Sequence, residues 1–152
     1  MYSFSELLSN FPLIMAMSAW VVAQIIKFLL TLLFYRDELN FKILMSSGGM
    51  PSSHTATVCA LSTSVALIEG FASPLFAACV VFSFIVMYDA AGVRRSAGEQ
   101  AQTLNQVILH LFDNQQIPIN TSVREIFGHT PVQVFVGAVI GILMPLIVSL
   151  FL

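Results

Sequence analysis

Three short stretches of the chain hold most of the side chains that could do chemistry. They are residues 48–55, with the sequence GGMPSSHT, residues 89–95, DAAGVRR, and residues 128–133, GHTPVQ. Imidazole, hydroxyl and guanidinium groups are side chains that bind phosphate and move its protons. We therefore interpret the three stretches as parts of one phosphate site, which the fold must bring together.

The first stretch has the features of a helix start that binds an anion. Ser52 or Ser53 can cap the helix, and the free N–H groups behind the cap form an anion site. His54, in the first turn, can then give a proton to a leaving oxygen. The alternative is a capped helix in which His54 has no chemical role.

The second stretch places two arginines after an acid at the end of an apolar segment. Arg94 and Arg95 carry planar forks of donors that suit phosphate, and Asp89 could orient one of them or help to bind a metal. The alternative is that both arginines form an ordinary basic flank of a membrane span.

The third stretch sets His129 four residues before Gln133, so that both lie on one face if the helix includes His129. The Gln133 side-chain oxygen can accept one imidazole N–H, which presents the other ring nitrogen outward as a nucleophile. Gly137 and Gly141 continue the same spacing and predict close packing against a neighbouring helix.

Lys27 is the single charge inside the first long apolar segment. An ionisable group at that depth is costly unless it is paired or functional, so Lys27 is a candidate phosphate ligand. The alternative is that its amine extends along the helix to the membrane surface.

Apolar segments that could position these stretches dominate the sequence. Of the 152 residues, 57% are hydrophobic and 9% are charged, whereas a soluble domain has about 25% charged residues. Lipid must therefore be the solvent for much of the surface. We predict one all-α transmembrane domain, a helical bundle of about four transmembrane helices plus one amphipathic interfacial helix. The predicted spans are residues 11–34, 53–69, 74–90 and 131–152, and the amphipathic helix belongs to a polar loop, residues 91–129, lying on the membrane or against the bundle.

Four spans place both polar connections, and with them all six Lys and Arg residues, in or near one membrane face. The positive-inside rule makes that face cytoplasmic in a bacterial membrane. The net charge of −2 provides no basic field, so nucleic acid is not expected as a partner. Cys59 and Cys79 lie in apolar runs and predict buried free thiols.

Residues 51–54, PSSH, resemble the Pro-Ser-Gly-His motif of the type-2 phosphatidic acid phosphatase and vanadium haloperoxidase superfamily. Residues 129–141 resemble its closing motif of His, Asp four residues later and spaced glycines. Together, the three stretches are particularly similar to the divergent bacterial and plastid branch of that superfamily. The resemblance implies hydrolysis of a phosphate monoester or pyrophosphate, often on a lipid, without a metal or other cofactor. It also implies a bacterial inner membrane or a plastid membrane.

The resemblance gives the candidate residues roles by position. His129 would be the nucleophile that takes the phosphoryl group, and His54 would protonate the leaving group and then activate water. Gln133 would orient His129. The other candidates would bind phosphate, namely Ser52, Ser53, Lys27, Arg94 and Arg95, or support the site, namely Asp89, Arg36 and Glu125.

The sequence also departs from the superfamily pattern. Eight residues separate Lys27 from Arg36, whereas six separate the Lys and Arg of the superfamily's first motif. Gln133 replaces an Asp, and an amide orients the ring without bringing a charge; Glu125 could supply one if the helix extends back that far. The superfamily core uses six helices, so a homodimer would complete the bundle.

The leading interpretation is a membrane phosphatase that hydrolyses a lipid phosphate or diphosphate through a phosphohistidine. The alternative is a non-catalytic lipid-phosphate carrier or membrane assembly factor built on a decayed phosphatase site. A third interpretation is a metal-dependent transferase using Asp89 and Glu99, although these acids are too few and wrongly spaced for a two-metal clamp.

Overall fold

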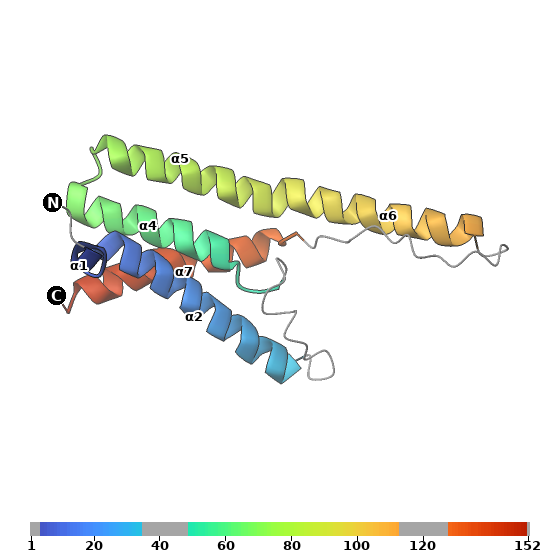
Figure 1. Cartoon of the computed structure of the whole chain (residues 1–152), viewed down its shortest axis with the longest axis horizontal. Coiled ribbons are helices and arrows are strands. Elements are labelled where there is room, and N and C mark those ends of the chain that lie inside the picture. The colour runs from blue at the N-terminus through green and yellow to red at the C-terminus, as the bar shows by residue number, and fades with distance from the viewer. Residues whose placement is uncertain (1–3, 35–48, 113–127, 152) are drawn as a thin grey trace.

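The described part of the chain is built from helices. The computed structural model describes residues 4–34, 49–112 and 128–151, and these contain no strand. In chain order, the elements are α1 (Phe4–Leu7), α2 (Phe11–Phe34), α4 (Ser53–Glu69), α5 (Pro74–Tyr88), the π-helical turn η2 (Asp89–Val93), α6 (Arg94–Phe112) and α7 (Pro131–Ser149). The predicted all-α helical membrane bundle is confirmed (Figure 1).

Three helical stretches of the described residues are long and apolar enough to cross a membrane: Phe11–Phe34, Pro74–His110 and Pro131–Ser149. The other predicted span, α4, has 17 residues. Its length is therefore about 25 Å, less than a hydrocarbon core of about 30 Å. This shorter helix contacts α2, α5 and α7, and so lies in the middle of the bundle (Figure 1).

Small side chains allow α2 to approach α4 closely. The buried cluster between the two helices consists of alanines, namely Ala19, Ala23, Ala56 and Ala60. Because lipid tails are as apolar as leucine, helices in a membrane associate through close packing of small residues rather than through the hydrophobic effect.

The contact of α7 with α4 depends on two glycines. A Cβ atom on Gly137 would lie 2.4 Å from the Ser52 carbonyl oxygen, and one on Gly141 would lie 2.4 Å from the Ala56 carbonyl oxygen. The structure thus has the close helix packing that the glycine spacing predicted. This contact fixes the start of α7 beside the start of α4.

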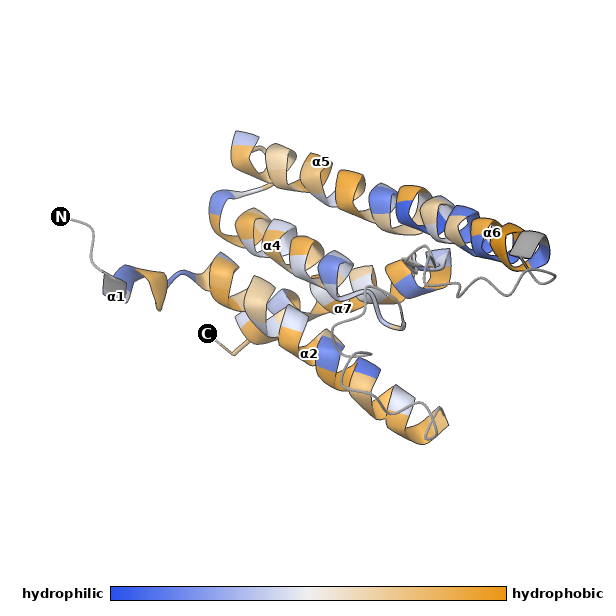
Figure 2. Cartoon of the chain, turned by 45° about the vertical axis from the view of Figure 1, so that its right-hand side comes forward, coloured by the Kyte–Doolittle hydropathy of each residue, from blue (hydrophilic) through white to orange (hydrophobic). Residues whose placement is uncertain are grey.

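Large apolar side chains cover the outside of the bundle. Phe28 of α2, Phe82 of α5 and Leu143 of α7 are all exposed, and orange ribbon predominates on these helices in Figure 2. Water would not tolerate so much exposed apolar surface on one small domain. Lipid is therefore the solvent around these helices.

The helix that begins at Pro74 was predicted to end near residue 90, but it extends further. It continues through η2 into α6 without a loop, so α5 and α6 form one long rod (Figure 1). Residues 91–112, predicted as part of a polar loop with an amphipathic helix, are helical throughout and follow α5 without a break. The predicted amphipathic helix does exist as α6, but its main neighbour among the described elements is η2 rather than the bundle.

The polar stretches gather at one end of the bundle. At this end α4 and α7 begin and α5 passes into η2, while both chain termini lie at the other end (Figure 1). Ser52 caps α4 and Thr130 caps α7, each accepting a backbone N–H of the first turn. These caps fix where the two helices that carry the histidines begin.

Candidate functional site

The first turn of α4 is held by the Ser52 hydroxyl. Its oxygen accepts the Thr55 N–H at 3.4 Å and the Thr55 hydroxyl at 3.0 Å. Ser52 has no exposed surface and Ser53 is buried beside it, whereas the His54 side chain is exposed. The cap therefore turns the imidazole of His54 out of the bundle while the serines stay inside.

A backbone hydrogen bond joins the starts of α4 and α7. The Ser52 N–H donates to the Gln133 carbonyl oxygen at 3.1 Å. The Gln133 side chain also contacts the His129 ring. This backbone bond and the packing of Gly137 on Ser52 therefore bring the two histidine-bearing turns together.

His129 is buried and its ring is oriented by Gln133. The Nδ1 atom lies 3.2 Å from the Gln133 Oε1 atom, which also accepts the Thr130 N–H at 3.0 Å. Because that atom accepts a backbone N–H, it is the amide oxygen, and the imidazole proton must sit on Nδ1. Nε2 of the neutral ring then keeps the lone pair that a nucleophile needs.

The surroundings of His129 favour its neutral form. Burial is the main cause that lowers its pKa below the ordinary value, and the positive charges of Lys27 and His54 lower it further. Hydrogen bonds to the Gln133 side chain and the Gly49 backbone act in the opposite direction, because they stabilise the charged ring. The net lowering leaves the ring unprotonated at neutral pH. Lys27 and His54 therefore lie within electrostatic reach of His129, and the Gly49 backbone lies within hydrogen-bonding reach.

The π-helical turn η2 supplies the anchor for His129. The Arg94 N–H donates to the Asp89 carbonyl oxygen, one residue further back than in an α-helix. That shift keeps the Arg94 N–H from the Ala90 carbonyl oxygen, which instead accepts the His129 N–H at 3.0 Å. The backbone of His129 is therefore fixed to the long rod of α5 and α6.

Gly128 allows this attachment because its backbone lies directly against α6. A Cβ atom there would be 2.3 Å from both the Cα and the backbone N of Arg95. Backbone atoms cannot move aside as the end of a flexible side chain can, so only glycine fits at this position.

Lys27 reaches the site from α2. Its side chain is 5% exposed, which is inconsistent with an amine that extends to the membrane surface. A Cβ atom on Gly49 would lie 2.9 Å from the Lys27 Cε atom and 3.6 Å from Nζ, and Gly49 has a φ of +94° that favours glycine. The Lys27 amine therefore lies at the loop before α4, where it acts electrostatically on both histidines.

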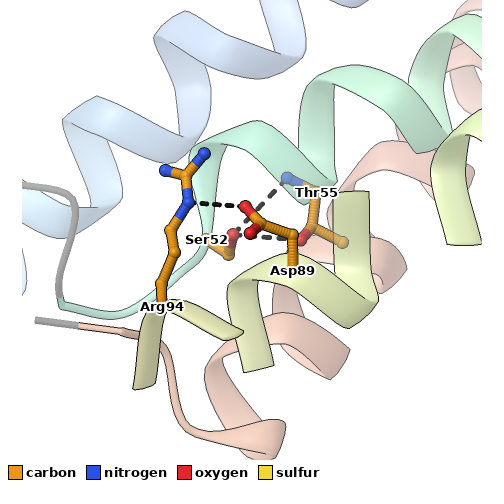
Figure 3. A network of polar contacts seen from close by, with 4 residues as sticks. All are labelled: Ser52, Thr55, Asp89 and Arg94. Atoms are coloured by element: carbon orange, nitrogen blue, oxygen red, sulfur yellow. Dashed lines mark hydrogen bonds and ion pairs between the residues drawn. The ribbon is translucent and has the colours of Figure 1, made fainter. Parts of the chain in front are cut away.

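Arg94 and Asp89 form an ion pair at the η2–α6 junction. Figure 3 shows this pair in one view with the Ser52 cap of α4. The charges of Arg94 and Asp89 both act on His54. Asp89 thus holds the Arg94 guanidinium near His54. This matches the interpretation that Asp89 orients an arginine rather than the alternative that it helps to bind a metal.

Arg95 is the predicted phosphate ligand that the structure does not bring to the site. Its Nε atom lies 3.0 Å from Glu99 Oε1, four residues along α6, and both side chains are largely exposed. Arg36 and Glu125 lie outside the described residues. The other predicted residues meet at one end of the bundle, namely Lys27, Ser52, Ser53, His54, Asp89, Arg94, His129 and Gln133.

Three residues of the predicted stretches make contacts that were not predicted from the sequence. Gly49 contacts Lys27, Gly128 packs on α6, and the Ala90 carbonyl oxygen holds His129. A glycine within each histidine-bearing stretch was the available signal for the first two. A carbonyl released by a π-helical turn has no signal in a single sequence.

The described residues offer no set of metal ligands. No group of three or more His, Cys, Asp or Glu side chains gathers among them. Asp89 and Glu99, the acids of the metal-dependent interpretation, each pair with an arginine instead. The donors present in this part of the chain suit an anion better than a divalent cation.

The fold and site define a helical membrane protein with two histidines and a buried lysine around a common centre. The family model described as the divergent PAP2 family matches residues 8–144. The chain belongs to this family. It is also similar to the uncharacterised membrane protein YuiD of Bacillus subtilis (strain 168), at 42% identity over 156 aligned positions that cover 96% of this chain and 98% of the relative. No solved structure matches the chain.

Proposed function

We propose that this protein is a membrane phosphatase that hydrolyses a lipid phosphate or diphosphate through a phosphohistidine on His129. One observation supports the proposal most: the buried His129 ring is held with Nδ1 on the Gln133 oxygen, within electrostatic reach of His54 and Lys27. Membership of the divergent PAP2 family supports the same chemistry. A lipid is the natural substrate because the site lies at one end of a bundle whose sides face lipid.

The first half of the reaction transfers the phosphoryl group to the protein. The His129 Nε2 lone pair forms a bond to phosphorus while the bond from phosphorus to the leaving oxygen breaks. Protonated His54 gives its proton to that oxygen, which departs as an alcohol or as a lipid monophosphate. Lys27 and Arg94 neutralise the phosphoryl oxygens, and Gln133 keeps accepting the Nδ1 proton of the charged ring.

The second half restores the protein. Neutral His54 takes a proton from water, and the water oxygen attacks the phosphorus as its bond to Nε2 breaks. Inorganic phosphate leaves, His129 is again neutral, and His54 is again protonated. Each histidine ends in its starting state, so the cycle needs no further reactant.

The chain provides its own matched control for this proposal. It has three histidines, and His110 lies exposed on α6, away from the site. Purified protein in detergent should release phosphate from a panel of lipid phosphates, with or without a chelator. His129→Ala should abolish release, His54→Ala should lower kcat about a hundredfold to ten-thousandfold, and His110→Ala should leave it unchanged. An acid-labile phosphate on wild-type protein, absent in His129→Ala, would identify the intermediate.

The second candidate function is a non-catalytic lipid-phosphate carrier or membrane assembly factor. Gln133 favours it, because an amide provides no charge to stabilise the imidazolium that forms on attack. In that case the purified protein binds lipid phosphate but no member of the panel loses its phosphate. Release that disappears with chelator would instead point to a metal-dependent reaction.

We further propose that the site faces the cytoplasm in a bacterial inner membrane or a plastid membrane. Lys27, Arg94 and Arg95, the described cations, all lie toward the end of the bundle that carries the site, and positive residues mark the cytoplasmic side. A reporter that is active only in the cytoplasm, fused to the C-terminus, should be inactive, because both termini lie at the opposite end (Figure 1).

A further inference from the structure

A groove of about 330 Å³ lies along α4 between α5 and α7, separate from the polar site. On the α5 side its wall is formed by Phe76, Val80, Ser83 and Met87. Their spacing of three or four residues places them on the face of α5 that packs on α4. No charged residue lines the groove.

The two serine hydroxyls in the groove wall are already hydrogen-bonded within the protein. The Ser62 and Ser83 hydroxyls lie 2.8 Å apart, and the Val58 carbonyl oxygen accepts Ser62 at 2.9 Å and Ser83 at 3.0 Å. These groups need no partner from an occupant. The groove therefore suits a hydrocarbon chain and does not suit a headgroup.

One end of the groove points toward the phosphate site. Cys59 lies five residues after His54 on α4, and Met87 lies two residues before Asp89 on the α5–η2 rod. At 1.5 Å per residue, the groove therefore begins about 8 Å below His54 along the helix axis. A lipid whose phosphate sits between the histidines would reach this end with the first carbons of its tail.

An aromatic pair forms the other end. The rings of Phe71 and Phe76 meet edge to face, with centroids 5.3 Å apart and an interplanar angle of 86°. Phe71 belongs to the turn between α4 and α5, and both rings line the groove. From Cys59 to Leu67, the groove extends about 12 Å along α4.

We propose that this groove binds the hydrocarbon tail of the phosphate-bearing lipid, and that the Phe71–Phe76 pair limits the length of chain that it accepts. The inference rests on the proposed function for the position of the headgroup. A single chain is the occupant, because one end of the groove points toward the phosphate site, about 8 Å away along α4, and the other end is the aromatic pair. A second copy of this protein is a poorer occupant, because it would have to insert a narrow apolar segment into the groove and would leave the phosphate site, with Lys27 and Arg94, unfilled.

Binding and turnover test the inference separately. The first probe is an alkyl phosphonate, which cannot be hydrolysed, carrying a photoreactive group at the end of its chain. After illumination with the full-length protein in lipid vesicles, mass spectrometry should find adducts on Phe71, Phe76 and neighbouring groove residues. This measurement does not depend on catalysis.

The second measurement is the chain-length profile of kcat/KM for alkyl phosphates. For short alkyl phosphates that bind from water, each methylene that becomes buried should raise kcat/KM about fourfold until the chain meets the aromatic pair. Phe76→Ala should move this break point to longer chains, and Thr63→Phe, which fills the groove midway, should move it to shorter ones. Phe82→Ala is the control, because Phe82 lies on the same helix but faces lipid. Size-exclusion chromatography checks that each variant folds.

The outcomes distinguish this inference from the proposed function. Adducts in the groove with opposite shifts in the two variants support it. Adducts spread over lipid-facing residues, with phosphate release intact and equal profiles in Phe76→Ala and Phe82→Ala, overturn the groove and leave the phosphatase standing. Adducts in the groove without phosphate release from any substrate support the tail site and reject the phosphatase.

Discussion

Gln133 is the residue on which the chemistry of this site most depends. Its side-chain oxygen accepts both the Thr130 N–H and the His129 Nδ1 proton, so one amide completes the cap of α7 and orients the ring. The sequence predicted this spacing and this orientation. It could not show that the same oxygen also serves the cap, because two functions of one atom depend on the local geometry.

Gln133→Glu should change the pH dependence of the proposed reaction while keeping the cap. Glutamate at this position of a capping box accepts the same bonds, and its charge stabilises protonated His129, so the pKa of His129 should rise. Neutral His129 is the nucleophile, so activity is lost as pH falls through its pKa. The acid limb of the kcat/KM profile should therefore shift to higher pH by about one to two units.

Titration of the His129 ring by NMR provides an independent check on that variant. An unchanged ring pKa in Gln133→Glu would show that the side chain at 133 does not contact the imidazole in solution. Gln133→Leu is the opposite control, because it removes the acceptor and should lower the pKa further.

Gly49→Ala should impair the site through Lys27. The added Cβ would lie 2.9 Å from Lys27 Cε, and the φ of +94° costs a non-glycine residue about 1–2 kcal/mol. Gly70→Ala is a close control, since Gly70 has a φ of +83° but nothing within 4 Å of the added atom. Both variants should lose thermal stability, Gly70→Ala because its φ of 83° and ψ of 160° suit only glycine, but Gly49→Ala alone should raise the KM for the phosphate substrate. Equal KM values in the two variants would contradict a role for the Lys27 contact.

At the scale of elements, the helix starts were predictable and the helix continuation was not. Ser52, Ser73-Pro74 and Thr130-Pro131 are strong start signals, and all three helices begin there. Asp89 and the two arginines that follow it indicated the end of a span, yet the helix continues to Phe112. A change from apolar to polar residues marks where lipid ends, and a helix can cross that boundary without a break.

The π-helical turn explains how a helix that passes the site also takes part in it. From the sequence, residues 89–95 and residues 128–133 were expected to converge because both lie at the same membrane face. The structure adds a specific bond, from His129 N–H to the Ala90 carbonyl oxygen. Such insertions of one residue in a helix are frequent at functional sites.

Gly128→Ala should separate positioning of His129 from folding of the bundle. Its Cβ would meet Arg95 backbone atoms at 2.3 Å and push the segment before α7 away from η2. A shift of about 1 Å in a reacting group can cost about a hundredfold in rate, so kcat should fall by that order while helix content stays constant by circular dichroism. Gly92→Ala, with nothing within 4 Å of the added atom, should keep wild-type kcat. Full activity in Gly128→Ala would show that the contact with α6 does not position the histidine.

For the molecule as a whole, the bundle places a polar end on an apolar body. Composition was sufficient to predict this, because 9% charged residues cannot coat a soluble domain. The depth of α4 within the bundle was less predictable, since a short span and a central helix have the same apolar pattern. Packing against the glycines of α7 on one side and the alanines of α2 on another is what makes α4 central.

The long rod predicts where water meets the protein. Pro74–His110 has 37 residues, which corresponds to about 55 Å of helix, against about 30 Å of hydrocarbon. In a variant without Cys59 and Cys79, Thr103→Cys on α6 should react with a membrane-impermeant maleimide, and Leu143→Cys on α7 should not. Equal protection of the two thiols in inside-out vesicles would place α6 in the lipid.

That excess length also makes the rod a mechanical link. Its length exceeds the thickness of a hydrocarbon core, and its inner part holds the backbone of His129 through one carbonyl oxygen of the π-helical turn. Tilting or rotating α6 must therefore move the Ala90 carbonyl oxygen, since no loop lies between η2 and α6 to absorb the motion. An antibody fragment that binds α6 from outside the bilayer should therefore shift the buried His129 imidazole.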